Sequence, residues 1–220
     1  MVIAYTVLDT MLRKESEAMR REKRLDGIDV SHWEGRIQFH RVREAGIRIV
    51  YIKATQGRDI VDPDFERNYR EADREGLHVG FYHYVMARNL EEAKEEAAFF
   101  FEKIKDKNQR VKPSMDFEEF GELTHQEIRN ISLQFLRELE ARSGHRSVIY
   151  SNASNATTVF DDDRLREYPL WIAQYGVSRP DMENPWRRWS GWQYTDSGRV
   201  RGITGKVDRD YFRRDILIRE

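Results

Sequence analysis

The stretch from residue 48 to residue 85, RIVYIKATQGRDIVDPDFERNYREADREGLHVGFYHYV, decides the fold that we expect for this chain. Its two ends, 48–54 and 79–85, are rich in β-branched and aromatic residues, and this composition predicts two strands. Between them, residues 64–75 carry apolar side chains at helical spacing and are followed by Gly76, a typical residue at the end of a helix. A strand, a helix and a second strand in this order predict two parallel strands joined by a helical crossover.

The same alternation continues along the rest of the chain. One helix is predicted for 89–105, which opens with an Asn-x-x-Glu start, and another for 124–142, where Thr124 and Glu127 can form a capping box. Further strands are predicted at 27–30, 113–117, 147–150, 170–173, 191–194 and 206–208. About eight strands alternating with helices favour a mainly parallel sheet that closes into a barrel. Because the later connections are shorter and less helical, we expect an α/β fold: an irregular TIM-like β/α barrel in which some helices are missing.

Composition bounds the domain organisation. The 220 residues are 39% hydrophobic and 35% charged, with a net charge of −1 and no cysteine. This length suits one catalytic barrel domain over residues 27–220. We expect residues 1–26 to form a charged N-terminal extension, because 13–24 carry six basic and three acidic side chains. That segment is either a solvated helix or arm, or an electrostatic tether to an anionic partner.

Composition also excludes several classes of protein. The net charge near zero is unlike that of a dedicated nucleic-acid binder, and the lack of cysteine excludes a disulfide scaffold and thiolate chemistry. No apolar stretch reaches the ~18–20 residues that span a bilayer, so we expect no stable membrane insertion. The short apolar run 2–8 lacks the flanks of a secretory signal, which favours accumulation in the cytoplasm before release to the cell wall.

The segment KPSMDFEEF, residues 112–120, is the most informative for chemistry. On a strand, Asp116 and Glu118 would project from one face with Cα atoms about 6.6 Å apart. Two neighbouring carboxylates repel each other, so that partial burial raises the pKa of one of them. A glycosidase needs such a pair, one group to protonate the leaving oxygen and one to stabilise positive charge. A solvated acidic strand end is the alternative.

Other acidic and aromatic residues fall at predicted strand ends. Asp29 either belongs to a site or caps the following turn, and Asp208 and Asp210 repeat the acidic theme near the C-terminus. A barrel brings such strand ends to one rim. Aromatic rings in or just after strands can stack on sugars or simply pack in the core: Trp33, Tyr82, Tyr84, Tyr150, Trp171, Trp192 and Tyr194. The histidines show no metal-ligand spacing and the glycines no nucleotide-binding motif, so we expect no metal and no cofactor.

At these residues the chain resembles the glycoside hydrolase family 25 lysozymes, which are N-acetylmuramidases. The resemblance runs from about residue 27 to residue 212. It is carried, in order, by GIDVSHWEG, KATQG, DFERN, GFYHYV, MDFEEF, YSN, LWIAQY, WQY and VDRDYF. It implies an irregular β/α barrel that cleaves the β-1,4 bond between N-acetylmuramic acid and N-acetylglucosamine.

The resemblance also implies roles for particular residues. Glu118 is the proton donor, Asp116 its carboxylate partner, and Asp29 and Asp208 supporting acids. The residues expected to bind substrate are Lys53, Tyr82, Tyr84, Tyr150, Trp171, Gln174 and Gln193. The nucleophile is either a carboxylate or the acetamido oxygen of the substrate, and we expect retention of configuration. The chain departs from the family at two positions, with Gln56 where Glu is frequent and Asp210 where Asn is common.

The resulting hypothesis is a monomeric peptidoglycan hydrolase that acts on glycan strands at the bacterial cell wall and does not bind nucleic acid. It is either a phage-type endolysin or a bacterial wall-remodelling enzyme. A catalytically weak glycan-binding barrel and a hydrolase of another N-acetylglucosamine polymer are the alternatives.

Overall fold

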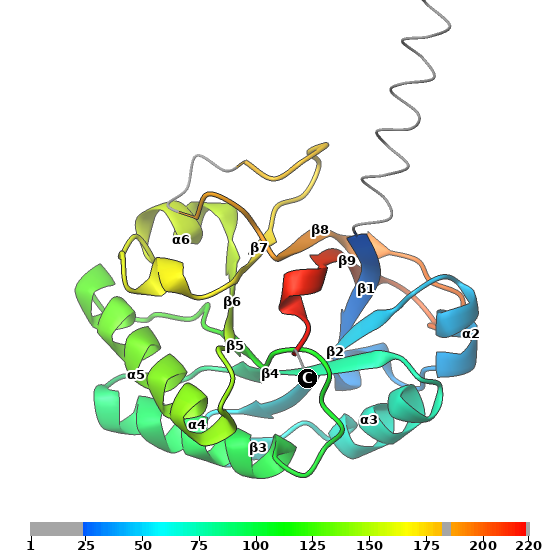
Figure 1. Cartoon of the computed structure of the whole chain (residues 1–220), viewed down its shortest axis with the longest axis horizontal. Helices are drawn as coiled ribbons and strands as arrows, with labels where there is room; N and C mark the ends of the chain where they lie inside the picture. Colours follow the sequence, from blue (N-terminus) through cyan, green and yellow to red (C-terminus); the bar gives the residue numbers. More distant parts are fainter. Residues whose placement is uncertain (1–23, 182–185, 219–220) are drawn as a thin grey trace, which may run out of the picture.

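The computed structural model describes residues 24–181 and 186–218 (Figure 1). The first strand, β1 (Arg24–Val30), begins three residues before the expected start of the barrel domain at residue 27. Residues 24–26 are therefore part of the barrel wall. The remainder of the expected N-terminal extension, residues 1–23, lies outside the described residues.

Eight strands close into a barrel, as expected. In sequence order the strands are β1, β2 (Ile49–Gln56), β3 (Ile60–Val61), β4 (His78–Tyr84), β5 (Ser114–Asp116), β6 (Val148–Asn152), β7 (Leu170–Ala173), β8 (Gly191–Gly198) and β9 (Val207–Arg213). The sheet order is β1-β9-β8-β7-β6-β5-β4-β2-β3, and pairing of β1 with β2 closes the barrel. Apart from β3, neighbouring strands from β1 through β8 run parallel, whereas β9 is antiparallel to both β1 and β8. The sequence did not predict the short β3, which is an antiparallel addition to β2.

Helices cover part of the outside of the barrel, as Figure 1 shows. They are α2 (Phe39–Glu44), α3 (Phe65–Arg74), α4 (Leu90–Ile104), α5 (His125–Ser143) and α6 (Ala153–Thr158), with single 3-10 turns η1 (His32–Glu34), η2 (Leu165–Glu167) and η3 (Arg214–Ile216). The Asn89 side chain caps α4, and Thr124 and Glu127 form the predicted capping box of α5. The helices predicted at 64–75, 89–105 and 124–142 are thereby confirmed.

Aromatic side chains fill one end of the barrel interior. Tyr51, Trp171 and Phe212 are almost fully buried, with ring centroids 4.6 Å apart for Tyr51 and Trp171 and 5.5 Å for Trp171 and Phe212. Glycines make room for these rings, because a Cβ atom at Gly80 would lie 2.8 Å from Tyr51 and one at Gly191 would lie 2.7 Å from Trp171. This packed layer closes that end of the barrel, so the site must form at the open carboxyl ends of the parallel strands.

Candidate active site

A cavity of about 200 Å³ opens at the carboxyl ends of the parallel strands. Its lining residues are Asp29, Ser31, Trp33, Lys53, Tyr82, Tyr84, Asp116, Glu118, Tyr150, Trp171, Gln193 and Asp208. Every predicted site residue except Gln174 is among them.

Strand register explains why residues so distant in sequence meet in this cavity. Tyr84 on β4 pairs with Asp116 on β5, which pairs with Tyr150 on β6, which pairs with Trp171 on β7. Directly paired residues point to the same face of a sheet, so this row faces the barrel interior together. On the other side of the barrel, Asp29 on β1 pairs with Asp208 on β9.

Asp116 and Glu118 do not both lie on one strand, although the sequence predicted that they would. Strand β5 ends at Asp116, so Glu118 projects from the segment that follows it and is exposed, while Asp116 is buried. Both side chains nevertheless line the same cavity, and the charge of Glu118 acts on Asp116. Burial raises the pKa of Asp116 well above its ordinary value, the charge and hydrogen bond of Glu118 raise it further, and the charge of Lys53 partly offsets both. The raised pKa that the sequence predicts for one member of the pair falls on Asp116.

A second acidic group lies on the facing strands. Asp210 is fully buried on β9, and one of its carboxyl oxygens accepts a hydrogen bond of 2.9 Å from the Trp171 indole. The Gln193 amide donates a bond of 2.8 Å to Asp29. Burial raises the pKa values of Asp29 and Asp210 well above the ordinary range, and charge repulsion within the group, including from Asp208, raises them further. These carboxyl groups therefore do not all ionise together at neutral pH.

Gln193 links this acidic group to two tyrosines. Its amide oxygen accepts hydrogen bonds from the hydroxyl groups of Tyr150, at 2.9 Å, and Tyr175, at 2.5 Å. Tyr175 was missed as a site residue, although it ends the segment LWIAQY. Its position after β7 is the signal that could have found it, since residues that follow a barrel strand belong to the rim.

Lys53 is the cation of the cavity, and its environment is fixed by close contacts. Its amine donates a hydrogen bond of 2.8 Å to Gln56 and lies 4.9 Å from the centre of the Tyr84 ring. Partial burial lowers its pKa, while the charges of Asp116 and Asp62 oppose this shift. Gln56 therefore orients the lysine without adding another charge.

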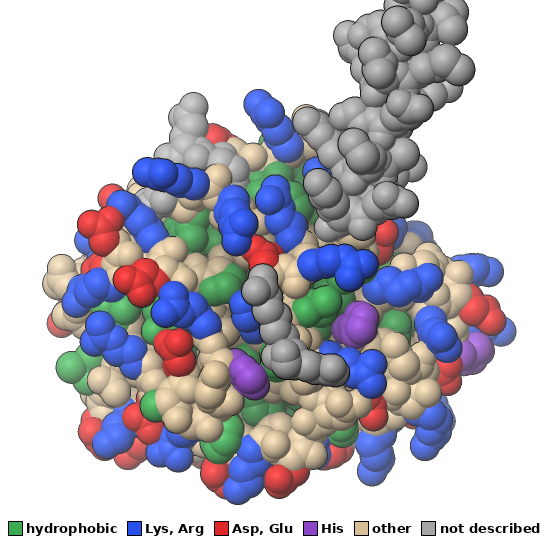
Figure 2. Space-filling model, in the orientation of Figure 1, with side chains coloured by type: hydrophobic (Ala, Val, Ile, Leu, Met, Phe, Trp, Pro, Cys, Tyr) green, Lys and Arg blue, Asp and Glu red, His purple; other side chains and the backbone are tan. Residues whose placement is uncertain are grey.

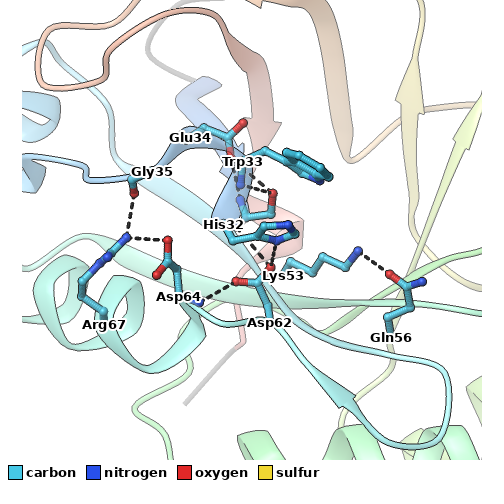
Figure 3. Close-up of polar contacts among 10 residues, drawn as sticks. His32, Trp33, Glu34, Gly35, Lys53, Gln56, Asp62, Asp64 and Arg67 are labelled. Carbon is cyan, nitrogen blue, oxygen red and sulfur yellow. Dashed lines mark hydrogen bonds and ion pairs between the residues drawn. The ribbon is translucent and has the colours of Figure 1, made fainter.

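The turn after β1 forms the rim and carries an exposed tryptophan (Figure 3). Trp33 is 81% exposed, although its backbone is held by the capping box of Ser31 and Glu34. In the same turn, Nδ1 of the neighbouring His32 lies 2.7 Å from the carboxylate of the buried Asp62. A large exposed ring on a rigid turn is suited to stacking against a sugar face.

Gln174 lies away from the cavity lining in the described structure. Its side-chain oxygen accepts a hydrogen bond of 2.7 Å from the Asp181 backbone, and its carbonyl accepts one of 2.9 Å from the Trp192 indole. The structure thus places Gln174 in the loop after β7, where its side chain hydrogen-bonds to the Asp181 backbone and does not line the cavity.

His83 is a buried structural residue. Its ring nitrogens contact the Thr55 hydroxyl at 2.7 Å and the Glu96 carboxylate at 3.0 Å. Within residues 24–181 and 186–218, no group of three or more His, Asp or Glu side chains is arranged to hold a metal ion. In the same residues no helix has the length and apolar character needed to cross a bilayer.

Comparison with known proteins identifies the family. The model of the glycosyl hydrolases family 25 matches residues 28–203. The chain is 38% identical over 197 residues to the uncharacterized protein YegX of Escherichia coli O6:H1, covering 86% of this chain and 69% of YegX. It is 34% identical over 200 residues to lysozyme M1 of Streptomyces globisporus, covering 86% of this chain and 67% of that enzyme.

Comparison of the fold with solved structures also identifies a lysozyme. The crystal structure of the bacterial lysozyme from Streptomyces coelicolor superposes with a TM-score of 0.79 at 32% identity, covering 86% of this chain and 91% of that one. The barrel, the acidic cavity at its carboxyl end and the family match over most of the chain lead to one conclusion. The chain belongs to glycosyl hydrolase family 25 and is a peptidoglycan hydrolase of the lysozyme type.

Proposed function

We propose that this enzyme cleaves the β-1,4 bond between N-acetylmuramic acid and N-acetylglucosamine, with Glu118 as the general acid and Asp116 as its carboxylate partner. The observation that carries the proposal is the presence of both carboxyl groups in the lining of one cavity beside Lys53, where burial and the charge of Glu118 raise the pKa of Asp116. Glu118 is the exposed member and can reach the oxygen of the leaving sugar, whereas the buried Asp116 is better placed to accept or donate a hydrogen bond.

The burial of Asp116 favours a substrate-assisted mechanism. Its raised pKa favours the protonated form of this carboxyl group, which is a poor nucleophile. In this proposal the acetamido oxygen of the substrate attacks the anomeric carbon, Asp116 orients the acetamido group, and the product retains its configuration.

The remaining cavity residues bind and orient the glycan. Trp33 and Tyr84 offer ring surface at the rim, and the Tyr150 and Gln193 pair offers hydrogen-bonding groups deeper in the site. Asp29 and Asp208 line the same cavity, and the negative charge that this partly ionised group keeps stabilises the positive charge that develops on the sugar ring. The enzyme acts as a monomer on glycan strands of the bacterial cell wall, and the structural similarity to the CTP1L endolysin, at 27% identity, is compatible with an endolysin role.

The test is digestion of purified peptidoglycan, with mass spectrometry of the borohydride-reduced products. New N-acetylmuramic acid reducing ends are expected with the wild type and none with Glu118→Gln. The matched control is Glu122→Gln, an exposed glutamate in the same connection between β5 and α5 that does not line the cavity, which should digest at the wild-type rate. Substantial turnover by Glu118→Gln would overturn the assignment of the acid. New N-acetylglucosamine ends would overturn the choice of bond, and peptidoglycan binding without cleavage would point to a binding barrel.

Stereochemistry tests the mechanism separately. Proton NMR of the first products should show the β-anomer of the new reducing end before mutarotation. Initial formation of the α-anomer would exclude both retaining mechanisms.

A further inference from the structure

The general acid of the proposed function, Glu118, belongs to neither a strand nor a helix. It lies in the connection between β5 and α5, and its side chain is exposed. Irregular connections at the surface of a protein are more mobile than the elements that they join. A general acid must nevertheless keep a fixed distance to the oxygen that it protonates, so the segment that carries Glu118 has to be held by its neighbours.

Aromatic packing fixes the two ends of this segment, residues 117–120, which we call the acid segment. Phe117 is fully buried, and its ring meets that of Phe120 edge to face, at 5.1 Å between the ring centres. Between these two rings lie Glu118 and Glu119, both of which are exposed. The aromatic contacts therefore set where the segment begins and ends, but they do not hold the two glutamates themselves.

Two hydrogen bonds from the neighbouring connection hold Glu119. Strands β4 and β5 are adjacent and parallel, and the helices that follow them, α4 and α5, lie side by side (Figure 1). Tyr84, the last residue of β4, donates its hydroxyl to the Glu119 carboxylate at 3.1 Å. Arg88, which lies just before α4, donates from its guanidinium group to the Glu119 carbonyl at 2.9 Å. One bond fixes the side chain and the other the backbone directly after Glu118.

The Tyr84 hydroxyl is a dependable donor for this contact. Burial raises the pKa of Tyr84, and the charge of Asp116 and the hydrogen bond to Glu119 raise it further, so the hydroxyl keeps its proton. Among the described residues that line the active-site cavity, Glu118 is present and Glu119 is not. The side chain of Glu119 is thus engaged by Tyr84 outside the lining, whereas that of Glu118 is open to the substrate.

Arg88 ties the acid segment to the start of α4. Its backbone N–H donates to the Glu92 carboxylate at 2.7 Å, and the side chain of Asn89 caps the same helix. On the face of the molecule that Figure 2 shows, Lys and Arg side chains lie among those of Asp and Glu. Arg88 differs, because within residues 24–181 and 186–218 its guanidinium group donates only to backbone carbonyls, those of Ala87 and Glu119. It joins two connections instead of neutralising a carboxylate.

We propose that Arg88 and Glu119 are positioning residues that hold the Glu118 carboxyl group at the distance from the substrate that proton transfer requires. The inference rests on the proposed function, since it takes Glu118 as the general acid. It also gives different roles to the two adjacent glutamates of the segment MDFEEF. The first exchanges the proton, and the second receives the contacts that fix the first.

The experiment measures kcat and KM of the full chain on a soluble glycan of alternating N-acetylglucosamine and N-acetylmuramic acid, by release of reducing ends. Arg88→Gln and Glu119→Ala should each lower kcat about tenfold, because displacement of a reacting group by about 1 Å can cost up to about a hundredfold. KM should stay within about twofold of the wild type, and Arg88→Lys, which keeps a donor, should recover part of the loss. The matched controls, Arg70→Gln on α3 and Glu122→Gln, replace exposed residues and should leave both constants unchanged.

Glu119→Gln separates positioning from proton transfer. The amide oxygen of glutamine can still accept a hydrogen bond from the Tyr84 hydroxyl, so turnover and its pH profile should stay close to those of the wild type. Loss of turnover as complete as that of Glu118→Gln would show that Glu119 itself transfers a proton, and would overturn the proposal. The double variant Tyr84→Phe/Glu119→Ala should be no slower than the slower single variant, because both changes remove one contact. Additive losses would show that the two residues are not coupled, against the proposal.

The same series distinguishes this inference from the proposed function. Wild-type kcat in both Arg88→Gln and Glu119→Ala, with Glu118→Gln inactive, would overturn the positioning role alone. A raised KM with unchanged kcat would show that the two residues bind substrate and would also overturn it. Turnover by Glu118→Gln would instead overturn the proposed function. Urea midpoints equal to that of the wild type are expected for all variants, which checks that a lower kcat does not come from unfolding.

Discussion

Replacement of Asp208 by asparagine should stabilise the folded protein at neutral pH while lowering its activity. Asp208 is half-buried on β9, opposite Asp29 on β1. Burial, opposed by a hydrogen bond with Asp29 and assisted by the charge of Glu34, raises the pKa of Asp208 from 3.8 to about 6. The folded state therefore resists the ionisation that this carboxyl group undergoes freely in the unfolded chain.

The sign and size of the effect follow from proton linkage. Between pH 3.8 and about 6 the folded protein holds more protons at Asp208 than the unfolded chain does, so stability is present below this range and is lost as the pH rises through it. A separation of about two pH units corresponds to about 3 kcal/mol, and solvent screening of a half-buried group reduces this to about 1–2 kcal/mol. Asparagine cannot ionise, so the variant keeps this free energy at neutral pH.

Urea unfolding at about pH 7.5 and about pH 4 checks this reasoning. At the higher pH, Asp208→Asn should have a free energy of unfolding about 1–2 kcal/mol above that of the wild type, and at the lower pH the difference should disappear. The control is Asp106→Asn, an exposed aspartate after α4, for which no change is expected at either pH. A variant that is no more stable than the wild type at pH 7.5, or equally stabilised at both pH values, would refute the argument.

Three other substitutions probe the site, the barrel interior and a helix end. Asp116→Asn should reduce turnover severely but leave peptidoglycan pull-down measurable, because the substituted side chain keeps its shape at the cavity floor; unchanged turnover would contradict its role. Gly191→Ala places a Cβ atom 2.7 Å from Trp171 and 2.8 Å from Phe212, and the overpacking should lower stability by about 1–3 kcal/mol in urea unfolding. An unchanged urea midpoint would show that the Trp171 and Phe212 side chains can move to accommodate the added Cβ atom. Thr124→Ala removes the cap of α5, which should cost about 1 kcal/mol, whereas Glu122→Gln, which lies outside the cap, should cost nothing.

The strands and long helices were readable from local patterns. The helix α5 has its cap, its apolar face and its terminal Gly144 within one stretch of sequence, and the structure confirms all three. The two-residue β3 could not be predicted, because two residues carry too little periodicity and its pairing with β2 depends on the turn between them. The first residues of β1 were assigned to the extension because 13–24 are highly charged and the strand pattern begins at Gly27, yet the backbone of Arg24 to Asp26 pairs with β9.

The candidate site was predictable as a set of residues but not as a geometry. Motif order selected the residues that line the cavity, yet it also selected Gln174, whose side chain turns to the Asp181 backbone. Alternation along a strand predicted that Asp116 and Glu118 share a face, whereas β5 ends at Asp116 and Glu118 reaches it from the following segment. End-of-strand conformation depends on packing that no local pattern describes.

The sequence by itself therefore determined the β/α alternation, the family and the residues that make up the acid pair, because each depends on residue types in short segments. The closure of the barrel by β1 and β2 and the burial that raises the pKa of Asp116 were decided only by the tertiary structure. Register between distant strands places each charged side chain near particular others and sets its distance from water. Electrostatic energies depend on those distances, which the order of residues along the chain does not contain.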